Sequence, residues 1–385
     1  MFYDEIIGHE SLKKHLQFSV ENGRIPHAQI FSGDPGSGTL LMALAYAQHL
    51  LVSHLESDTA TYRQNLQKSE HLTHPDLHFV FPVASNQDVK SKPMSDLFLP
   101  AWRKFVAETP YGNAYDWFMQ IGIENKQGFI GVDEAQDIVR KLNLKSFEGG
   151  YKVMLIWMAE KMNTETANKL LKLIEEPTEK TVLILVSQDA AQLLQTIQSR
   201  CQLVEIPRMS EAVIEKALVD KYGLKNFEAS QIAKKAEGDF QKALQLLTPS
   251  SEDVYFEALF VRWVRLAFSA KGNKKAILDL LKWAEEVASK GRETQKSFLK
   301  YCLEVFRQAI LLNQNCKELV FFESKDAKFD INKFSPFVHP ENVFSIFELI
   351  KEASLHIERN GNAKIVLTDL SIKLTRLLHQ KNRSA

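Results

Sequence analysis

The sequence predicts three parts: an α/β domain with a parallel sheet over residues 1–207, a small helical domain over 208–248, and an all-helical bundle over 253–385. Strand-like and helix-like segments alternate in the first two hundred residues, which is the pattern of an α/β domain. After Pro207 no strand-like segment recurs, and long amphipathic segments follow. A chain of 385 residues is also too long for one hydrophobic core, so two or three domains are expected.

Apolar runs mark the strands of the first domain. Continuous runs of this kind are typical of parallel strands that are covered on both faces. A helix of strong helix formers over 40–51 follows the first run, and Asn163 and Pro177 delimit another helix with apolar residues at i, i+3, i+4 and i+7. The expected strands cover residues 28–32, 151–158, 181–187 and 203–207.

Residues 75–128 interrupt this alternation. The segment is polar and rich in proline at first, and then contains two helix-like stretches, A-W-R-K-F-V-A-E and A-Y-D-W-F-M-Q. We interpret residues 81–128 as an insertion that runs over the edge of the sheet. The sequence assigns no function to it.

After residue 207, helices are the only secondary structure that the sequence predicts. Ser210 is a capping residue, and a glycine ends the segment E-A-S-Q-I-A-K-K-A-E-G, as glycine often does after a helix. The polar stretch Thr248–Asp253 is the expected linker to the bundle. The expected helices of the bundle are Val254–Lys271, Lys274–Lys290, Thr294–Asn313, Glu341–Glu358 and Ala363–Gln380.

Composition excludes several classes of protein. Forty-eight basic residues balance forty-eight acidic ones, so no overall field attracts nucleic acid or an anionic membrane. The longest apolar runs are too short to cross a bilayer, and the beginning of the chain lacks the layout of a secretory signal. Three widely spaced cysteines fit a reducing compartment. We therefore expect a cytoplasmic protein without a membrane segment.

The stretch G-D-P-G-S-G-T-L, directly after the first strand, has the glycines of a phosphate-binding loop. A working loop reads G-x-x-x-x-G-K-S/T, in which the lysine neutralises phosphates and the hydroxyl holds magnesium. Gly33, Gly36 and Gly38 preserve the turn, but Thr39 stands at the lysine position and Leu40 at the hydroxyl position. A glycine turn is a weak indication by itself, and a simple turn stays open as an alternative.

A neighbouring strand gives a second test of nucleotide chemistry. In loop-type ATPases an acidic pair at the end of such a strand holds magnesium and orients the attacking water. The corresponding positions here are Trp157 and Met158, and neither side chain offers the oxygen that a hard cation requires. Glu160 lies three residues beyond Trp157, and Glu175 and Glu176 fall at a helix end as solvated charges. We expect no ATP hydrolysis in this chain's own site.

The loop Q-T-I-Q-S-R-C-Q follows the strand at 181–187 and contains Arg200. A guanidinium on such a loop can lie at the edge of a domain and stabilise phosphoryl-transfer charge in a neighbouring subunit. A lone arginine is more often an ordinary surface or ion-paired residue. The residues alone leave both interpretations open.

Several stretches together resemble the clamp-loader branch of the AAA+ ATPases, in particular a non-hydrolysing subunit type of the bacterial DNA polymerase III clamp loader. The most specific are S-R-C at 199–201 and the run N-K-L-L-K-L-I-E-E-P that ends at Pro177; G-D-P-G-S-G supports them. The resemblance covers nearly the whole chain apart from 81–128. The remaining stretches that carry it are I-I-G-H-E, R-I-P-H-A-Q-I-F-S-G, H-P-D-L, K-S-F-E-G-G-Y-K-V and I-E-R-N-G-N-A-K-I-V-L.

The resemblance implies an AAA+ α/β domain, a lid domain at 208–248 and a collar bundle at 253–385. Ser199, Arg200 and Cys201 match the motif whose arginine reaches the ATP of an adjacent motor subunit. Motor relatives also carry a sensing arginine in a G-x-x-R-x-A-L context, where this chain has Gln241. The positions that lack the chemistry of a motor subunit are Thr39, Leu40, Trp157, Met158 and Gln241.

Cofactors are not expected. The I-I-G-H-E segment would form part of the adenine pocket in motor relatives, which leaves weak residual nucleotide binding open. Bacterial relatives commonly carry a four-cysteine zinc module after the phosphate-loop helix, but this region has no cysteine. His54, His71, His74 and His78 lie nearby without a familiar ligand spacing, so we expect no zinc.

The resemblance thus implies a subunit that does not hydrolyse ATP, scaffolds the loader ring and donates a trans arginine finger during sliding-clamp loading. The implied partners are the motor (gamma/tau-like) subunits and the delta subunit, with the sliding clamp contacted indirectly and primed DNA inside the assembled ring. Two alternatives stay open. One is an active gamma-like ATPase motor, and the other is a stand-alone interaction protein with the AAA+ fold.

Overall fold

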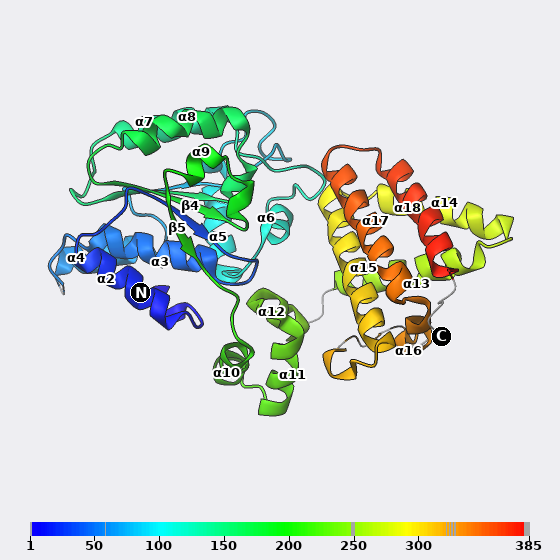
Figure 1. The fold of residues 1–385 in the computed structure, drawn as a ribbon. Coiled ribbons are helices and arrows are strands. Elements are labelled where there is room, and N and C mark those ends of the chain that lie inside the picture. Colours follow the sequence, from blue (N-terminus) through cyan, green and yellow to red (C-terminus); the bar gives the residue numbers. More distant parts are fainter. Residues whose placement is uncertain are drawn as a thin grey trace. The chain divides into compact units, whose positions relative to one another are not determined.

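The chain forms two compact units, each with its own hydrophobic core (Figure 1). The computed structural model describes residues 2–57, 59–247, 251–320, 322, 324, 326 and 329–380. The first unit comprises residues 1–123 and 127–247, and the second comprises 124–126 and 248–385. The expected domain boundary at residue 207 falls inside the first unit and stays a prediction.

A five-stranded parallel sheet forms the centre of the first unit, in the order β2-β3-β4-β1-β5. In the register of the sheet, Ile30 of β1 lies beside Leu185 of β4 and Leu203 of β5. The predicted parallel sheet is confirmed. Its strands are β1 (Ala28–Ser32), β2 (Leu77–Val80), β3 (Lys152–Trp157), β4 (Thr181–Ser187) and β5 (Gln202–Glu205).

Helices cover both faces of this sheet (Figure 1). Successive residues of a strand point to opposite faces. In β3, Leu155 and Trp157 accordingly join the core that contains α3, whereas Met154 and Ile156 join the core of α7 and α8. The helices of these layers are α1 (Phe2–Glu5), α2 (Glu10–Glu21), α3 (Thr39–Val52), α4 (Ala60–Glu70), α7 (Val132–Asn143), α8 (Thr164–Glu175) and α9 (Gln195–Gln198).

The limits of α8 follow from its sequence. The side chain of Asn163 accepts a hydrogen bond from Thr166 N at 2.8 Å and so satisfies a free amide at the beginning of the helix. The helix ends at Glu175, two residues before Pro177, because a residue that precedes proline disfavours helical backbone. Both predicted limits are confirmed.

The prediction that the α/β alternation is interrupted from residue 75 is wrong for the first residues of this segment. Edge strand β2 lies within it, and its four residues, with His78 among them, are too few to show a clear apolar run. The remainder forms a short 3-10 turn at Ser95–Phe98 and helices α5 (Leu99–Glu108) and α6 (Ala114–Gln120). We keep the name inserted segment for residues 81–128.

Three short helices complete the first unit: α10 (Glu211–Tyr222), α11 (Asn226–Ala236) and α12 (Phe240–Leu247). The hydroxyl of Ser210 accepts from Val213 N, and Gly223 ends α10 in the left-handed conformation. We call these three helices the lid. Ile214, Leu218 and Phe240 of the lid belong to the same core as α3.

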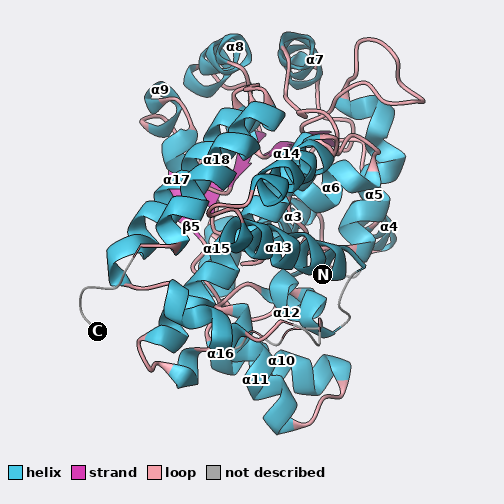
Figure 2. Ribbon diagram, turned by 90° about the vertical axis from the view of Figure 1, so that its right-hand side faces the viewer, coloured by secondary structure: helices cyan, strands magenta, loops and turns pink. Residues whose placement is uncertain are grey.

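The second unit consists of helices, without a strand among its described residues (Figure 2). The indole rings of Trp263 and Trp283 stack in its core, with centroids 5.0 Å apart. Of the expected linker Thr248–Asp253, residues 248–250 lie outside the described part, and Ser251 already begins a helix. The helices are α13 (Ser251–Ser269), α14 (Lys274–Ala288), α15 (Arg292–Asn313), α16 (Ile331–Phe334), α17 (Pro340–Glu358) and α18 (Ala363–Leu378).

The helices of the described part of the chain can be compared with the length of a membrane span. There, no helix combines the length and the apolar character needed to cross a bilayer.

Candidate functional site

The glycine-rich stretch Gly33–Leu40 leads from β1 into α3. It lies at the edge of the sheet formed by the carboxyl ends of the parallel strands. Gly36 and Gly38 have φ values of +74° and +88°, a region that glycine adopts without strain. Space also requires glycine at position 36, because a Cβ atom there would lie 1.8 Å from Asp239 Oδ1 of the lid. Gly36 and Gly38 thus allow a tight turn between β1 and α3.

Thr39 and Leu40 lie at the positions of the lysine and the metal-binding hydroxyl of a working loop. Both side chains are buried. Thr39 Oγ1 shares a hydrogen bond with Ser37 Oγ at 2.8 Å, and Leu40, in the first turn of α3, belongs to the core of the first unit. Neither residue can bring a positive charge to a bound phosphate.

The loop carries a negative charge that sequence reasoning did not single out. Arg208 Nε donates to Asp34 Oδ2 at 2.7 Å, and Arg208 Nη1 donates to Glu237 O at 3.1 Å. Hydrogen bonding to Asp34 raises the pKa of the Arg208 guanidinium. The aspartate is visible in the sequence, but its partner is 174 residues away and only the fold brings the two together.

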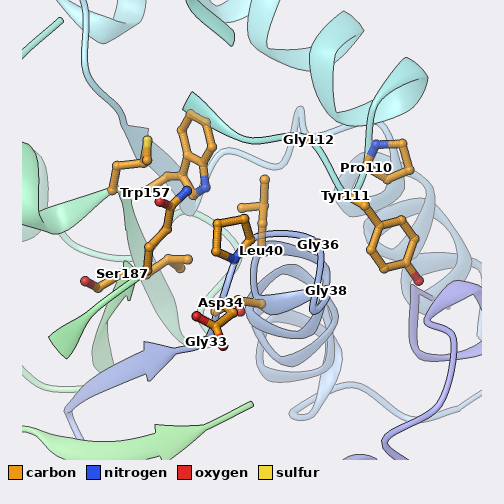
Figure 3. A pocket seen from close by; sticks show the side chains of 15 residues that line it. Gly33, Asp34, Gly36, Gly38, Leu40, Pro110, Tyr111, Gly112, Trp157 and Ser187 are labelled. Atoms are coloured by element: carbon orange, nitrogen blue, oxygen red, sulfur yellow. The ribbon is translucent and has the colours of Figure 1, made fainter. Parts of the chain in front are cut away.

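Trp157 ends strand β3 beside the loop (Figure 3), and Met158 is the next residue. Both are buried, and the Trp157 ring packs against Trp102 and Phe105 of α5, with centroid distances of 5.1 and 5.5 Å. Met158 adopts φ of +56°, which is uncommon for a residue with a side chain. This surrounding of rings and a thioether offers magnesium no hard ligand.

Glu160 is the carboxylate closest in sequence to this position. Burial raises its pKa, and its Oε1 accepts from Gln188 N at 3.5 Å. Its Oε2 is buried without a hydrogen-bond partner among the described residues. Glu160 does not line the cavity beside the loop, whereas Trp157 and Met158 do.

A cavity of about 30 Å³ remains beside the glycine loop (Figure 3). This volume has room for one or two water molecules, whereas small-molecule sites usually enclose ~300–1,000 Å³. The enclosed part of this cavity is therefore much smaller than a nucleotide. The cavity is lined by the loop, Pro110–Gly112, Trp157, Met158 and Val186–Gln188.

The lid also contacts the glycine loop. Phe240 N donates to Gly36 O at 3.2 Å. Gln241, at the predicted second-sensor position, lies next to this contact, and its Nε2 is 3.5 Å from Asp116 Oδ2 of α6. Here Gln241 is turned toward the inserted segment and carries no charge toward the loop.

Ser199, Arg200 and Cys201 follow the short helix α9, away from the residues that line the cavity. The Arg200 side chain is 40% exposed, and its Nε donates to Glu175 Oε1 at 2.6 Å. Its Nη1 donates to Thr196 O at 3.1 Å. Cys201 is half-buried, and burial raises the pKa of its thiol to about 11. Glu175 therefore positions the arginine at the surface of the first unit.

The four histidines after the phosphate-loop helix have separate surroundings. His54 hydrogen-bonds to Glu148 O at 3.2 Å, and His74 Nδ1 accepts from Asp76 N at 3.1 Å. Burial lowers the pKa of His74 and of His78. His71 is exposed and ends α4. Within the described ranges, no group of three or more histidine, cysteine or acidic side chains is placed to hold a metal ion.

The family is established by comparison with known proteins. The family model described as DNA polymerase III, delta subunit, matches residues 8–210, more than half of the chain. The chain therefore belongs to this family. The matched region contains the sheet, the glycine loop and the S-R-C motif.

Among known proteins, the delta' subunit of Bacillus subtilis is 26% identical over 208 residues, which are 54% of this chain and 50% of that protein. The tau subunit of Bacillus subtilis is 21% identical over 393 residues, 98% of this chain and 62% of that protein. A gamma subunit-related protein from Thermotoga maritima is 17% identical, with a TM-score of 0.39 over 95% of this chain and 99% of that one. The chain spans about half to two thirds of the curated relatives' lengths.

Within the family the chain is similar to the delta-prime subunits of clamp loaders, the subunit type that the sequence motifs resemble most narrowly.

Proposed function

We propose that this chain is a non-hydrolysing subunit of the DNA polymerase III clamp loader that lends Arg200 to the ATP site of a neighbouring subunit. In this role it holds the geometry of the ring and positions the delta subunit that opens the sliding clamp. One observation carries the proposal: Arg200 is 40% exposed on its own loop, while the chain's own glycine loop has no lysine for a phosphate and only a small cavity beside it.

The surroundings of Arg200 suit a finger that acts on another subunit. Glu175 and Thr196 hold Nε and Nη1, and in the described chain Nη2 donates to no other group. Glu175 is itself 48% exposed, so the ion pair can open toward a stronger anion at little cost. A triphosphate offers more negative charge than one carboxylate and favours the bidentate geometry of a guanidinium.

The second unit supports assembly with sibling subunits. Large apolar side chains are exposed on its helices, including Leu278 on α14, Phe344 on α17 and Ile365 on α18, which are 58, 76 and 67% exposed. Such exposed apolar side chains are available for contacts with other subunits. The proposed partners are motor (gamma/tau-like) subunits and the delta subunit, around primed DNA, in the cytoplasm.

The test is Arg200→Ala in a reconstituted loader. Loss of an arginine finger lowers phosphoryl transfer by roughly 10³–10⁵ in related systems, so hydrolysis at the adjoining site should nearly stop. The measurement is the rate of ATP hydrolysis stimulated by DNA and clamp.

Arg140→Ala is the matched control. Arg140 is also an exposed arginine that is paired with a carboxylate, on α7. Its loss should leave hydrolysis unchanged while assembly of both variants stays complete. A fully active Arg200→Ala loader would remove the finger role.

An active gamma-like motor is the second candidate, because the tau relative aligns over 98% of this chain. Titration of the isolated chain separates the two. Magnesium-dependent ATP binding in the micromolar range would favour the motor, whereas our proposal predicts at most weak occupancy and no turnover. The same sample, treated with a zinc chelator, should keep its stability, since we propose no resident metal.

A stand-alone interaction protein is the third possibility. Co-purification with the other loader subunits supports the proposed role, and a chain that remains monomeric in their presence contradicts it.

A further inference from the structure

The inserted segment contacts two of the positions at which the chain departs from a working nucleotide site, and it lines the cavity beside the glycine loop. Helix α5 supplies Trp102 and Phe105, which pack on Trp157. Helix α6 supplies Asp116, which faces Gln241. The turn between these helices, Thr109–Gly112, lies beside the glycine loop itself.

Tyr111, in this turn, joins three parts of the first unit. Its hydroxyl accepts a hydrogen bond from Ile7 N at 2.9 Å, in the segment before α2. Its ring meets Phe240 of the lid edge-on, with centroids 5.0 Å apart. At the glycine loop, a Cβ atom on Gly38 would lie 3.1 Å from Tyr111 Cε1. Figure 3 shows the ring beside Gly38, across the loop from Trp157.

The turn is built to hold Tyr111 in this place. Gly112 N donates to Thr109 O at 2.8 Å and closes the turn. A side chain at Gly112 would meet Phe105 and Thr109 O at 2.8 Å, so only glycine fits. Asn113 then begins α6 with a capping box to Asp116. Tyr111 itself is only 5% exposed.

We propose that the inserted segment is an internal replacement for a nucleotide, in which Tyr111 connects the N-terminal segment, the glycine loop and the lid. Pro110–Gly112 and Trp157 line the small cavity beside the loop, so a nucleotide bound at the loop would have to meet these residues. The ring of Tyr111 supplies contact area and its hydroxyl satisfies a buried amide, so the lid is held without any ligand. The lid position of this chain is thereby independent of ATP.

The inference concerns the first unit alone and does not depend on the role of Arg200. Its test is hydrogen exchange on the isolated full chain. Tyr111→Phe keeps the ring and removes the acceptor, so the Ile7 amide should exchange about tenfold faster or more. Tyr222→Phe is the matched control, because Tyr222 packs on the same Phe240 at 6.3 Å without contacting Ile7 N.

A second variant tests the connection to the lid. Tyr111→Ala should speed the exchange of amides in α10, α11 and α12 by tenfold or more while β4 keeps its protection. An equal increase in β4 and the lid, or an unchanged Ile7 amide in Tyr111→Phe, would contradict the proposal.

Addition of magnesium and ATP to the unmodified chain provides the third arm. Lid exchange should stay unchanged at millimolar ATP. A slower lid would show that nucleotide enters the site and holds the lid itself, which overturns the inference whatever the outcome for Arg200→Ala in the loader.

Discussion

Gly36 is a residue at which the glycine loop and the lid are in direct contact. The space that a Cβ atom would need is taken by the Asp239 carboxylate, whose Oδ1 also accepts from Lys242 N at the beginning of α12. A side chain at position 36 would displace this cap and open the contact between Phe240 N and Gly36 O. Here the glycine serves the contact between two parts of the protein.

Gly36→Ala should therefore lower the free energy of unfolding by about 2–3 kcal/mol, from left-handed strain together with the displaced cap. Gly23→Ala is the control, since Gly23 has φ of +65° with open space around its Cβ position. It should cost only the strain, about 1 kcal/mol. Urea denaturation of both variants measures the difference, and equal losses would rule out the contact with the lid.

The ion pair between Asp34 and Arg208 is a second contact of the glycine loop. It joins the loop to the segment that precedes the lid. Both side chains are about half exposed, so the pair itself contributes little to stability. The pair places the Asp34 carboxylate, with Arg208 bound to it, on a loop where phosphates would need an unpaired positive charge.

At the scale of elements, helices α5 and α6 supply an aromatic cluster around Trp157. In a working site an acidic side chain would stand at the position of Trp157. Trp102 stacks on Phe81 with centroids 4.5 Å apart and meets Trp117 edge-on at 5.5 Å. Trp117 Nε1 donates to Pro82 O at 2.8 Å. Both tryptophans are fully buried. The inserted segment is thus part of the core, although its beginning is polar.

Trp102→Ala should destabilise the first unit by about 3–5 kcal/mol, because the cavity left in this cluster cannot collapse fully. Phe147→Ala is the comparison, since the Phe147 side chain is 80% exposed and its loss should change stability by less than about 0.5 kcal/mol. Chemical denaturation measures both. A small effect of Trp102→Ala would show that the inserted segment is peripheral to the core.

At the scale of the molecule, the two units have separate cores, and each unit contains buried tryptophans. Trp263 and Trp283 hold the second unit together: Trp263 Nε1 donates to Ser371 Oγ at 2.9 Å and Trp283 Nε1 to Leu259 O at 3.1 Å. Independent cores predict that damage to one unit leaves the other folded.

Trp283→Ala should lower the stability of the second unit by about 3–5 kcal/mol and speed amide exchange in α13 and α14. Exchange in β3 and β4 should not change. Ile365→Ala, at a residue that is 67% exposed, is the control. Faster exchange in β3 after Trp283→Ala would show that the two units unfold as one.

Local sequence determined much of this fold. The mostly apolar runs at 28–32 and 181–187 became β1 and β4, because short runs of this kind are typical of strands that are buried on both faces of a sheet. Capping by Asn163 and Ser210 determined where α8 and α10 begin. The absence of a lysine and of an acidic pair is equally a property of the sequence and needs no coordinates.

Only the tertiary structure decided which distant residues contact the glycine loop. Tyr111 reaches Ile7 across 104 residues and Arg208 reaches Asp34 across 174. Strand β2 also depended on tertiary context, because four residues with a histidine among them form a strand only when β3 supplies the partner backbone. Periodicity and caps act over a few residues, whereas these contacts depend on where the chain folds back on itself, which no local pattern records.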